Sequence, residues 1–188
     1  MSITQAARAA ALTGLLGPGG PVPPDAVPTS QVIAVLREHG EPEPIEITDT
    51  DVAGMCAVAA RLHEVFAAPD AVTAARLLNA ILAGAAGPPR LSSHDGTAWH
   101  LHLDEYDNDT PWDEWFAVSS AAALAELLVA RQAPPGGLCA ARGCGQPFVH
   151  QGGGTPRRYC SSRCATRERV AAHRRARATG WSASRAGG

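Results

Sequence analysis

The chain has 188 residues and contains no lysine, so arginine supplies all sixteen of its permanently basic side chains. Alanine, glycine and proline are abundant, and together with the missing lysine they indicate a GC-rich coding bias that carries no signal of function. No stretch approaches the roughly 20 apolar residues of a membrane-spanning helix. The N-terminus, Met1 to Gln5, also lacks the charged and then apolar segments of an export signal. We therefore expect a cytoplasmic protein with no membrane partner.

Signatures of catalysis are missing as well. Ser119 and Ser120 lack the glycine frame of a nucleophile elbow, and no glycine-rich phosphate loop or carboxylate pair stands out. His100, His102 and Asp104 suggest a metal site at first sight, but the two histidines share the polar face of a predicted strand. That arrangement is typical of a solvated edge, so we expect no enzymatic activity.

Cysteine is scarce but concentrated, because four of the five cysteines fall in the last fifty residues. They form the pairs Cys139-x4-Cys144 and Cys160-x3-Cys164, separated by fifteen residues. Each pair offers two thiolates from one tight turn, as a tetrahedral metal requires. In a reducing compartment such pairs bind metal more often than they form disulfides. We predict one structural Zn²⁺ held by all four cysteines, with no coordination position left for catalysis.

Three other residues are candidates for the same chemistry. His150 and His173 are alternative zinc ligands, but His150 lies in a glycine-rich turn and His173 lies nine residues beyond Cys164. We expect His150 to be free and His173 to face DNA. Cys56 stands alone in an apolar helical pattern, which predicts a small core residue.

The charge is divided sharply along the chain. Residues 1–138 carry six arginines and seventeen acidic residues, for a net charge of −11. Residues 139–188 carry ten arginines and only Glu168, for a net charge of +9. Zinc bound to four thiolates adds −2, which leaves this segment near about +7. The pattern predicts an acidic body with a basic arm that binds phosphate.

Apolar periodicity and capping residues predict a mostly helical body. The helical stretches are 4–16, 29–39, 52–66, 70–82 and 112–131. Between Pro89 and Leu103 the period changes to that of strands, and the pair Asp95-Gly96 predicts the turn of a β-hairpin. The fold class is thus α+β: a mostly helical N-terminal domain with a small β-hairpin, followed by a treble-clef-like zinc finger.

Breaks in composition divide the chain into four parts, with Pro134–Gly137 as the hinge into the metal module. The parts are an N-terminal helix and flexible linker over 1–28, an α+β domain over 29–132, the zinc finger with its basic helix over 138–178, and a disordered tail over 179–188.

Within the finger, the residues between the two cysteine pairs predict a hairpin around Gly152–Gly154, with Phe148 and Tyr159 as a small apolar core. Ser161 or Ser162 is suited to cap the helix that follows, which places Cys164 in its first turn.

Arginines dominate this last helix. Arg163, Arg167, Arg174 and Arg177 fall along one side of it, and arginine forks bind both phosphates and guanine edges. We predict that Arg167 and Arg174 contact bases, whereas residues 157–158 hold the backbone. The predicted DNA-binding set is Arg157, Arg158, Arg163, Arg167, Arg169, His173, Arg174, Arg175 and Arg177.

The segment 139–177 resembles the CGNR-type zinc finger, named for a Cys-Gly-Asn-Arg tetrapeptide at its second cysteine pair. That tetrapeptide falls on Cys164 to Arg167, where the cysteine and arginine are kept and the glycine and asparagine are replaced. Phe148 and the run 157–161 match the family's phenylalanine and its Arg-Arg-Trp-Cys-Ser run, with tyrosine in place of tryptophan. His150 stands where the family usually has aspartate.

The preceding residues resemble the ABATE domain, the usual partner of that finger. The resemblance rests on Leu78–Leu82, Pro89–Leu91, the strand with Trp99 and the Ala-Leu-rich helix before the finger. With the finger it spans roughly residues 29–178, and it implies a bacterial-type regulator of transcription under stress.

We therefore expect a regulator that binds double-stranded DNA through its finger, with an N-terminal domain that senses a small-molecule effector or forms a homodimer. An RNA-binding protein and a zinc-dependent protein-interaction module, in which the arm meets an acidic partner or its own acidic body, are the alternatives. RNA-binding proteins usually stack bases on aromatic side chains, and the last fifty residues offer only Phe148, Tyr159 and Trp181. This shortage favours duplex DNA.

Overall fold

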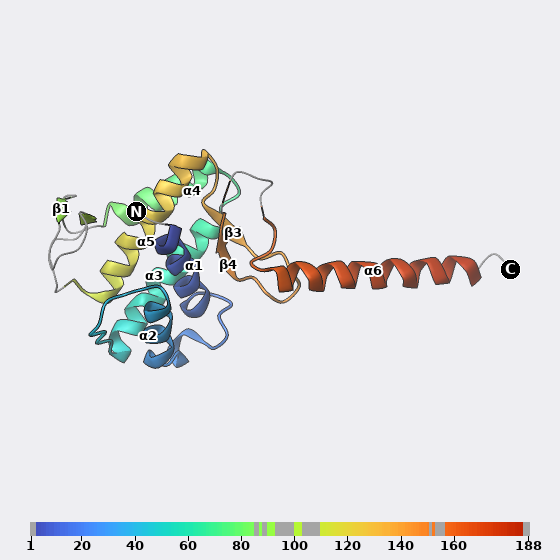
Figure 1. Ribbon diagram of the computed structural model, residues 1–188, viewed down its shortest axis with the longest axis horizontal. Helices are drawn as coiled ribbons and strands as arrows, with labels where there is room; N and C mark the ends of the chain where they lie inside the picture. The colour runs from blue at the N-terminus through green and yellow to red at the C-terminus, as the bar shows by residue number, and fades with distance from the viewer. Residues whose placement is uncertain are drawn as a thin grey trace.

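The structure is a computed structural model, and it describes residues 3–84, 87, 90–92, 100–102, 110–150, 152 and 157–185. Five of its helices gather into a body, and the sixth projects from that body alone (Figure 1). The elements in chain order are α1 (Ile3–Leu16), the short 3-10 helix η1 (Pro24–Ala26), α2 (Thr29–Glu38), α3 (Asp49–Ala67), α4 (Ala71–Leu82), β1 (Arg90–Ser92), β2 (His100–His102), α5 (Trp112–Arg131), β3 (Gly136–Leu138), β4 (Pro147–Val149) and α6 (Ser162–Arg185). The predicted fold class is confirmed.

The starts of the central helices follow from local side-chain chemistry. At α3, the Thr48 hydroxyl accepts a hydrogen bond from the backbone N–H of Asp51 at 3.3 Å, and the Asp51 carboxylate accepts one from the Thr48 N–H at 2.8 Å. At α4, the carboxylate of Asp70 accepts the N–H of Thr73 at 2.7 Å. Both caps are formed by residues within one turn of the helix start, so they depend on no distant residue.

Helix α1 belongs to the core of the body. It packs against α3 and α5, and Leu12 and Leu16 are fully buried in one cluster with Phe66 and Phe116. The glycine- and proline-rich segment after this helix is typical of a linker, and it predicts a helix separate from the domain over 29–132. That separation was wrong for the helix, since its apolar face completes the core.

Helix α1 also carries a buried cation. The Arg8 guanidinium pairs with Glu41, donates to Ser119 Oγ at 3.4 Å and lies 4.3 Å from the centre of the Trp115 ring. Burial lowers the pKa of Arg8, and the nearby Glu41 carboxylate opposes that shift. Trp112 donates its indole N–H to the Glu46 carbonyl at 2.7 Å. Trp112 and Trp115 are both partly buried against the core.

The strands of the body form the predicted antiparallel pair, with Arg90 opposite His102 and Ser92 opposite His100. The turn pair Asp95-Gly96 and the residues Trp99, Leu103 and Asp104 lie outside the described part of the chain. Cys56 is partly buried against the core, and its thiol donates to the Pro24 carbonyl at 3.4 Å. Among the described helices, none is long and apolar enough to cross a lipid bilayer.

The second strand pair joins the finger to the body. Strand β4 is buried along its whole length, and Val149 is a member of the body's core. A Cβ atom on Gly136 would overlap the Phe148 carbonyl oxygen and lie 2.9 Å from the Phe66 ring, so the strand passes close to α3. Gly14 of α1 touches the side chain of Gln146, which donates to the Gly14 carbonyl at 3.4 Å. Residues 136 and 137 of the predicted hinge therefore belong to a packed strand, β3, and do not form a free joint.

Candidate metal centre and arginine helix

The first cysteine pair lies in the turn between β3 and β4. The Cys139 N–H donates to the Gln146 carbonyl at 2.9 Å, and the Cys144 N–H donates to the Ala141 carbonyl at 3.0 Å. Glycine at 143 has a φ of 68°, a left-handed conformation that glycine adopts without a steric penalty. The Cys-x4-Cys segment is thus a knuckle that the strand pair holds at both ends.

The pairing of the strands corrects one expectation. The sequence predicted a hairpin between the two cysteine pairs, with Phe148 facing Tyr159. Instead β4 pairs with β3, so that Phe148 lies opposite Gly137. The segment after the turn is linked to the knuckle by the Ala140 N–H, which donates to the Arg158 carbonyl at 2.9 Å. Tyr159 packs on the cysteines and Phe148 does not belong to that cluster, because its strand is part of the body. Gly153 and Gly154 lie outside the described residues.

The second cysteine pair is placed by the start of α6. The Ser161 hydroxyl accepts the N–H of Cys164 at 3.3 Å, so Ser161 caps the helix and Cys164 lies in its first turn, as predicted. Cys160 lies just before the helix, and its carbonyl accepts a hydrogen bond from Arg157 at 2.7 Å. Capping and the arginine contact therefore fix where both sulfur atoms point.

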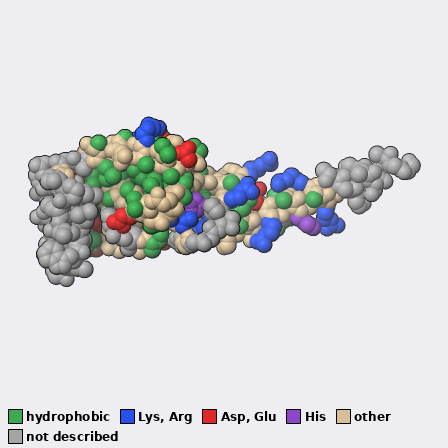
Figure 2. All heavy atoms as spheres, turned by 90° about the horizontal axis from the view of Figure 1, so that it is seen from above, with side chains coloured by type: hydrophobic (Ala, Val, Ile, Leu, Met, Phe, Trp, Pro, Cys, Tyr) green, Lys and Arg blue, Asp and Glu red, His purple; other side chains and the backbone are tan. Residues whose placement is uncertain are grey.

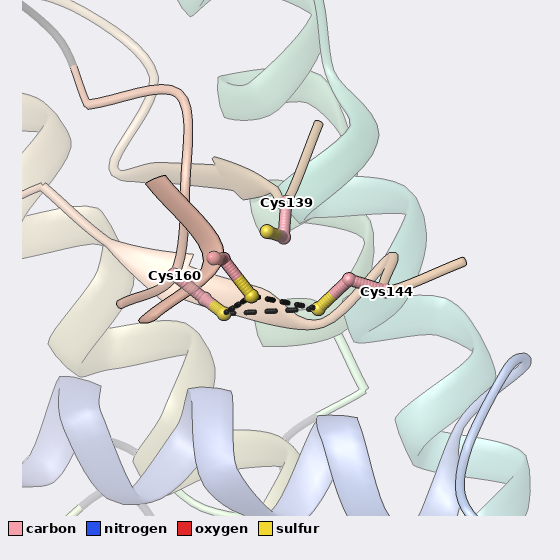
Figure 3. A group of neighbouring side chains, drawn as sticks. Cys139, Cys144 and Cys160 are labelled. Atoms are coloured by element: carbon pink, nitrogen blue, oxygen red, sulfur yellow. Dashed lines mark hydrogen bonds between the residues drawn. The ribbon is translucent and has the colours of Figure 1, made fainter. Parts of the chain in front are cut away.

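The four sulfur atoms fit a tetrahedral metal. The Sγ atoms of Cys144 and Cys160 are 3.7 Å apart, those of Cys160 and Cys164 are 3.7 Å apart, and those of Cys144 and Cys164 are 3.8 Å apart. Together with Cys139, all four lie within 4.8 Å of one another (Figure 3). A tetrahedron with zinc–sulfur bonds of about 2.3 Å has edges of about 3.8 Å. Neither His150 nor His173 belongs to this group of ligand atoms.

The thiols of this cluster do not ionise alike. Burial opposes ionisation of the Cys139 thiol, but backbone hydrogen bonds at Cys160 and Ala141 outweigh it and lower the pKa of Cys139 to about 7. Burial, together with hydrogen bonds to Cys139 and Cys164, raises the pKa of the Cys160 thiol to about 12. Burial also raises the pKa of the Cys144 thiol. Four thiolates at this spacing repel one another, and a divalent cation allows all of them to be ionised at once.

The geometry defines a four-cysteine zinc finger whose metal has a structural role, because no ligand position remains open. Residues 137–177 match the CGNR zinc finger family. The match begins in β3 and ends within α6, and it confirms the resemblance for this part of the chain. No curated protein matches the chain. The ABATE-like character of the preceding residues stays a prediction.

The predicted DNA-binding residues fall into two groups. Four of them make contacts within the finger itself or its helix: Arg157, Arg158, Arg167 and Arg169. The other five are Arg163, His173, Arg174, Arg175 and Arg177 of α6, and all nine side chains are exposed. The helix continues to Arg185, so the predicted disordered tail from residue 179 was placed too early. The alanines and arginines of the preceding run, 171–178, are strong helix formers, and the helix continues from that run past the glycine at 180.

His150 is not a metal ligand, as the sequence predicted, but its ring and backbone make contacts of their own. Its ring meets that of Phe148 edge to face, with centroids 5.4 Å apart, and its backbone N–H donates to the Pro135 carbonyl at 3.0 Å. Burial, followed by the positive charges of Arg131 and Arg157, lowers the pKa of His150. The histidine is therefore held in its neutral form against β4.

Sequence reasoning missed the residues that attach the finger. Gln146 and Gly136 make the contacts to α1 and α3, and Glu168 accepts the backbone N–H of Arg142 at 2.9 Å. The sequence does contain one indication of a special role for Glu168, because it is the only acidic residue of the segment 139–188, which has ten arginines.

Proposed function

We propose that this protein is a cytoplasmic, DNA-binding regulator of transcription that contacts duplex DNA through α6. One observation carries the proposal: α6 projects from the body as a lone helix with arginines spaced along it (Figures 1 and 2). Its 24 residues give a length of about 36 Å. The major groove of DNA admits an α-helix, and arginines are the residues that most often contact it.

The exposed arginines favour one side of the helix. At 100° per residue, Arg163, Arg174 and Arg177 fall on the same side, with about 16 Å of helix between the first two. Val170 lies between them and is 45% exposed. An exposed valine among arginines is suited to contact a thymine methyl group. We therefore assign base contacts to Arg174 and Val170, and phosphate contacts to Arg158 and Arg163.

The body supports the same assignment by its charge. Residues 1–138 carry a net charge of −11, which repels a phosphate backbone and favours an approach through the arm. Because α6 extends away from the body in Figure 1, the arrangement argues against the alternative in which the arm folds onto its own acidic body. The body is then the part that binds an effector or a second copy of the chain.

A selection from random DNA duplexes with the zinc-loaded protein tests the proposal. We expect an enriched motif, and Arg174→Ala is expected to lower affinity by about 1–3 kcal/mol at one position of that motif only. Replacing a phosphate-contacting arginine such as Arg163 with alanine is expected to weaken all sequences alike. It also reduces the slope of log K against log salt by about 0.9.

The matched control is Arg76→Ala, which removes an exposed arginine from α4. This variant is expected to change neither the affinity for DNA nor the slope of log K against log salt. Zinc content is measured for every variant, so that loss of the finger is not mistaken for loss of a contact. Absence of any enriched motif, with tight binding to single-stranded RNA or to an acidic protein, contradicts the proposal and supports the corresponding alternative.

A further inference from the structure

Two neighbouring residues of α6 bind the backbone of one knuckle residue, Arg142, at both its N–H and its carbonyl group. The Glu168 carboxylate accepts the backbone N–H of Arg142 at 2.9 Å. The Nη2 group of Arg167 donates a hydrogen bond to the carbonyl oxygen of Arg142 at 3.3 Å. Arg142 lies between Cys139 and Cys144, so both contacts join the first cysteine pair to the helix.

The same Nη2 group also reaches the second cysteine pair. It lies 3.8 Å from the Cys164 sulfur atom, within the range of an N–H···S hydrogen bond. A guanidinium Nη carries two hydrogens, so one group can serve both acceptors. Arg167 thereby connects the carbonyl of one knuckle residue with a sulfur atom from the other pair.

We propose that Arg167 and Glu168 are positioning residues of the zinc centre, which lock the knuckle to the helix that carries the fourth cysteine. Arg167 also places a positive charge beside a site whose four thiolates and zinc carry a net −2. Residues that hydrogen-bond to metal ligands typically change metal affinity about 10–100-fold when they are removed.

The chemistry of the two side chains suits this role. A planar guanidinium donates in two directions at once, whereas a lysine ammonium on a flexible stem does not hold that geometry. A carboxylate in the arm lowers its attraction for phosphate, so Glu168 is unfavourable for DNA binding. The hydrogen bond that Glu168 accepts from the backbone N–H of Arg142 is a structural reason for an acidic residue at this position. This inference concerns the metal centre and does not depend on the proposed DNA binding.

The test is a titration of the full-length protein with Zn²⁺ and with Co²⁺ against a competing chelator. We expect Arg167→Ala to weaken the affinity for both metals about 10–100-fold. The thiolate-to-cobalt absorption band should also shift, because the Cys164 sulfur loses its hydrogen bond. Arg163→Ala is the matched control: it removes an exposed arginine next to Cys164 that carries the same charge, and it should titrate like the wild type.

Two conservative variants extend the test to protein that folds normally. Arg167→Lys keeps the positive charge but loses the planar guanidinium with its several N–H donors. Its metal affinity should therefore lie between those of the wild type and the alanine variant. Glu168→Gln keeps an acceptor for the Arg142 N–H and should preserve the slow hydrogen exchange of that amide, whereas Glu168→Ala should lose it. The proposal is overturned if Arg167→Lys equals the wild type, or if Arg163→Ala weakens metal binding as much as Arg167→Ala does.

Discussion

The body and the finger are held together by different forces. The body buries large apolar side chains from five helices, and the fully buried ones include Leu12, Leu36, Phe66 and Phe116. The finger's own cluster consists of Cys139, Ala141 and Cys164, with three partly buried residues against it. A cluster this small releases too little free energy on burial to fold a chain segment. The difference shows that the finger depends on metal and hydrogen bonds where the body depends on apolar burial.

The β3–β4 pair belongs to both regions and makes the comparison testable. Its strands are buried against α1 and α3, and the turn between them carries two zinc ligands. Loss of the metal should therefore lower the thermal stability of the body, although the body has its own apolar core.

The largest expected effect comes from removing a zinc ligand. Cys160→Ser should reduce the zinc content from near one per chain to near zero, because three thiolates bind the metal far more weakly. The start of α6 should lose its order, and the body should keep a cooperative unfolding transition at a lower temperature. Elemental analysis and thermal melting check both parts.

Cys56→Ser is the control for that variant, since this thiol lies in α3 and outside the metal cluster. A Cys160→Ser protein that still binds stoichiometric zinc would contradict the ligand assignment. A body transition unaffected by zinc loss would show that the strand pair does not couple the two regions.

A smaller effect is expected at the strand that joins the regions. Gly136→Ala places a methyl group against the Phe148 carbonyl oxygen and the Phe66 ring, and it should destabilise the zinc-loaded protein by about 1–3 kcal/mol. Denaturant unfolding at saturating zinc measures this change. Gly84→Ala is the control, because its nearest neighbour is the Ile81 carbonyl at 3.4 Å. Equal stabilities of the two variants would mean that β3 does not pack against α3.

The smallest effect concerns pH. The pKa of His150 is lowered by burial and by the charges of Arg131 and Arg157, so the unfolded chain takes up its proton at a higher pH than the folded chain. The stability that neutral His150 provides is fully present above the unfolded pKa of about 6.5 and decreases as the pH falls toward the folded pKa. Melting temperatures measured below this pH should fall less steeply for His150→Gln than for the wild type.

His173→Gln is the matched control for the pH series, because this histidine is exposed on α6. Its melting temperatures should follow those of the wild type. Identical pH profiles for the wild type and His150→Gln would contradict the role assigned to the buried ring.

Local chemistry explains what the sequence predicted well. The caps at Thr48 and Asp70, the cap at Ser161 and the paired cysteines all act within a few residues, so their spacing is visible in the chain. The metal cluster was predictable for the same reason, since each pair is a single turn.

Contacts between distant residues explain what the sequence could not predict. Arg8 forms hydrogen bonds with Glu41, 33 residues away, and with Ser119, 111 residues away. The apolar periodicity of the sequence does not indicate contacts between such distant residues. The hydrogen bond from the Arg167 guanidinium to the Arg142 carbonyl spans 25 residues and could not be predicted either, whereas the base contact predicted for Arg167 stays a prediction. Packing of β4 against α1 was hidden for the same reason, as Gly14 and Gln146 lie 132 residues apart.

Because the finger packs against α1, a movement of α1 can rotate the base of α6. Helix α6 is about 36 Å long and is attached at one end only, so its far end amplifies any rotation at its base. A tilt of about 5° at the zinc centre displaces that end by about 3 Å, which approaches the rise of one base pair. If α6 binds duplex DNA as proposed, a small repacking of α1 would therefore be enough to change which base pair each arginine of α6 faces.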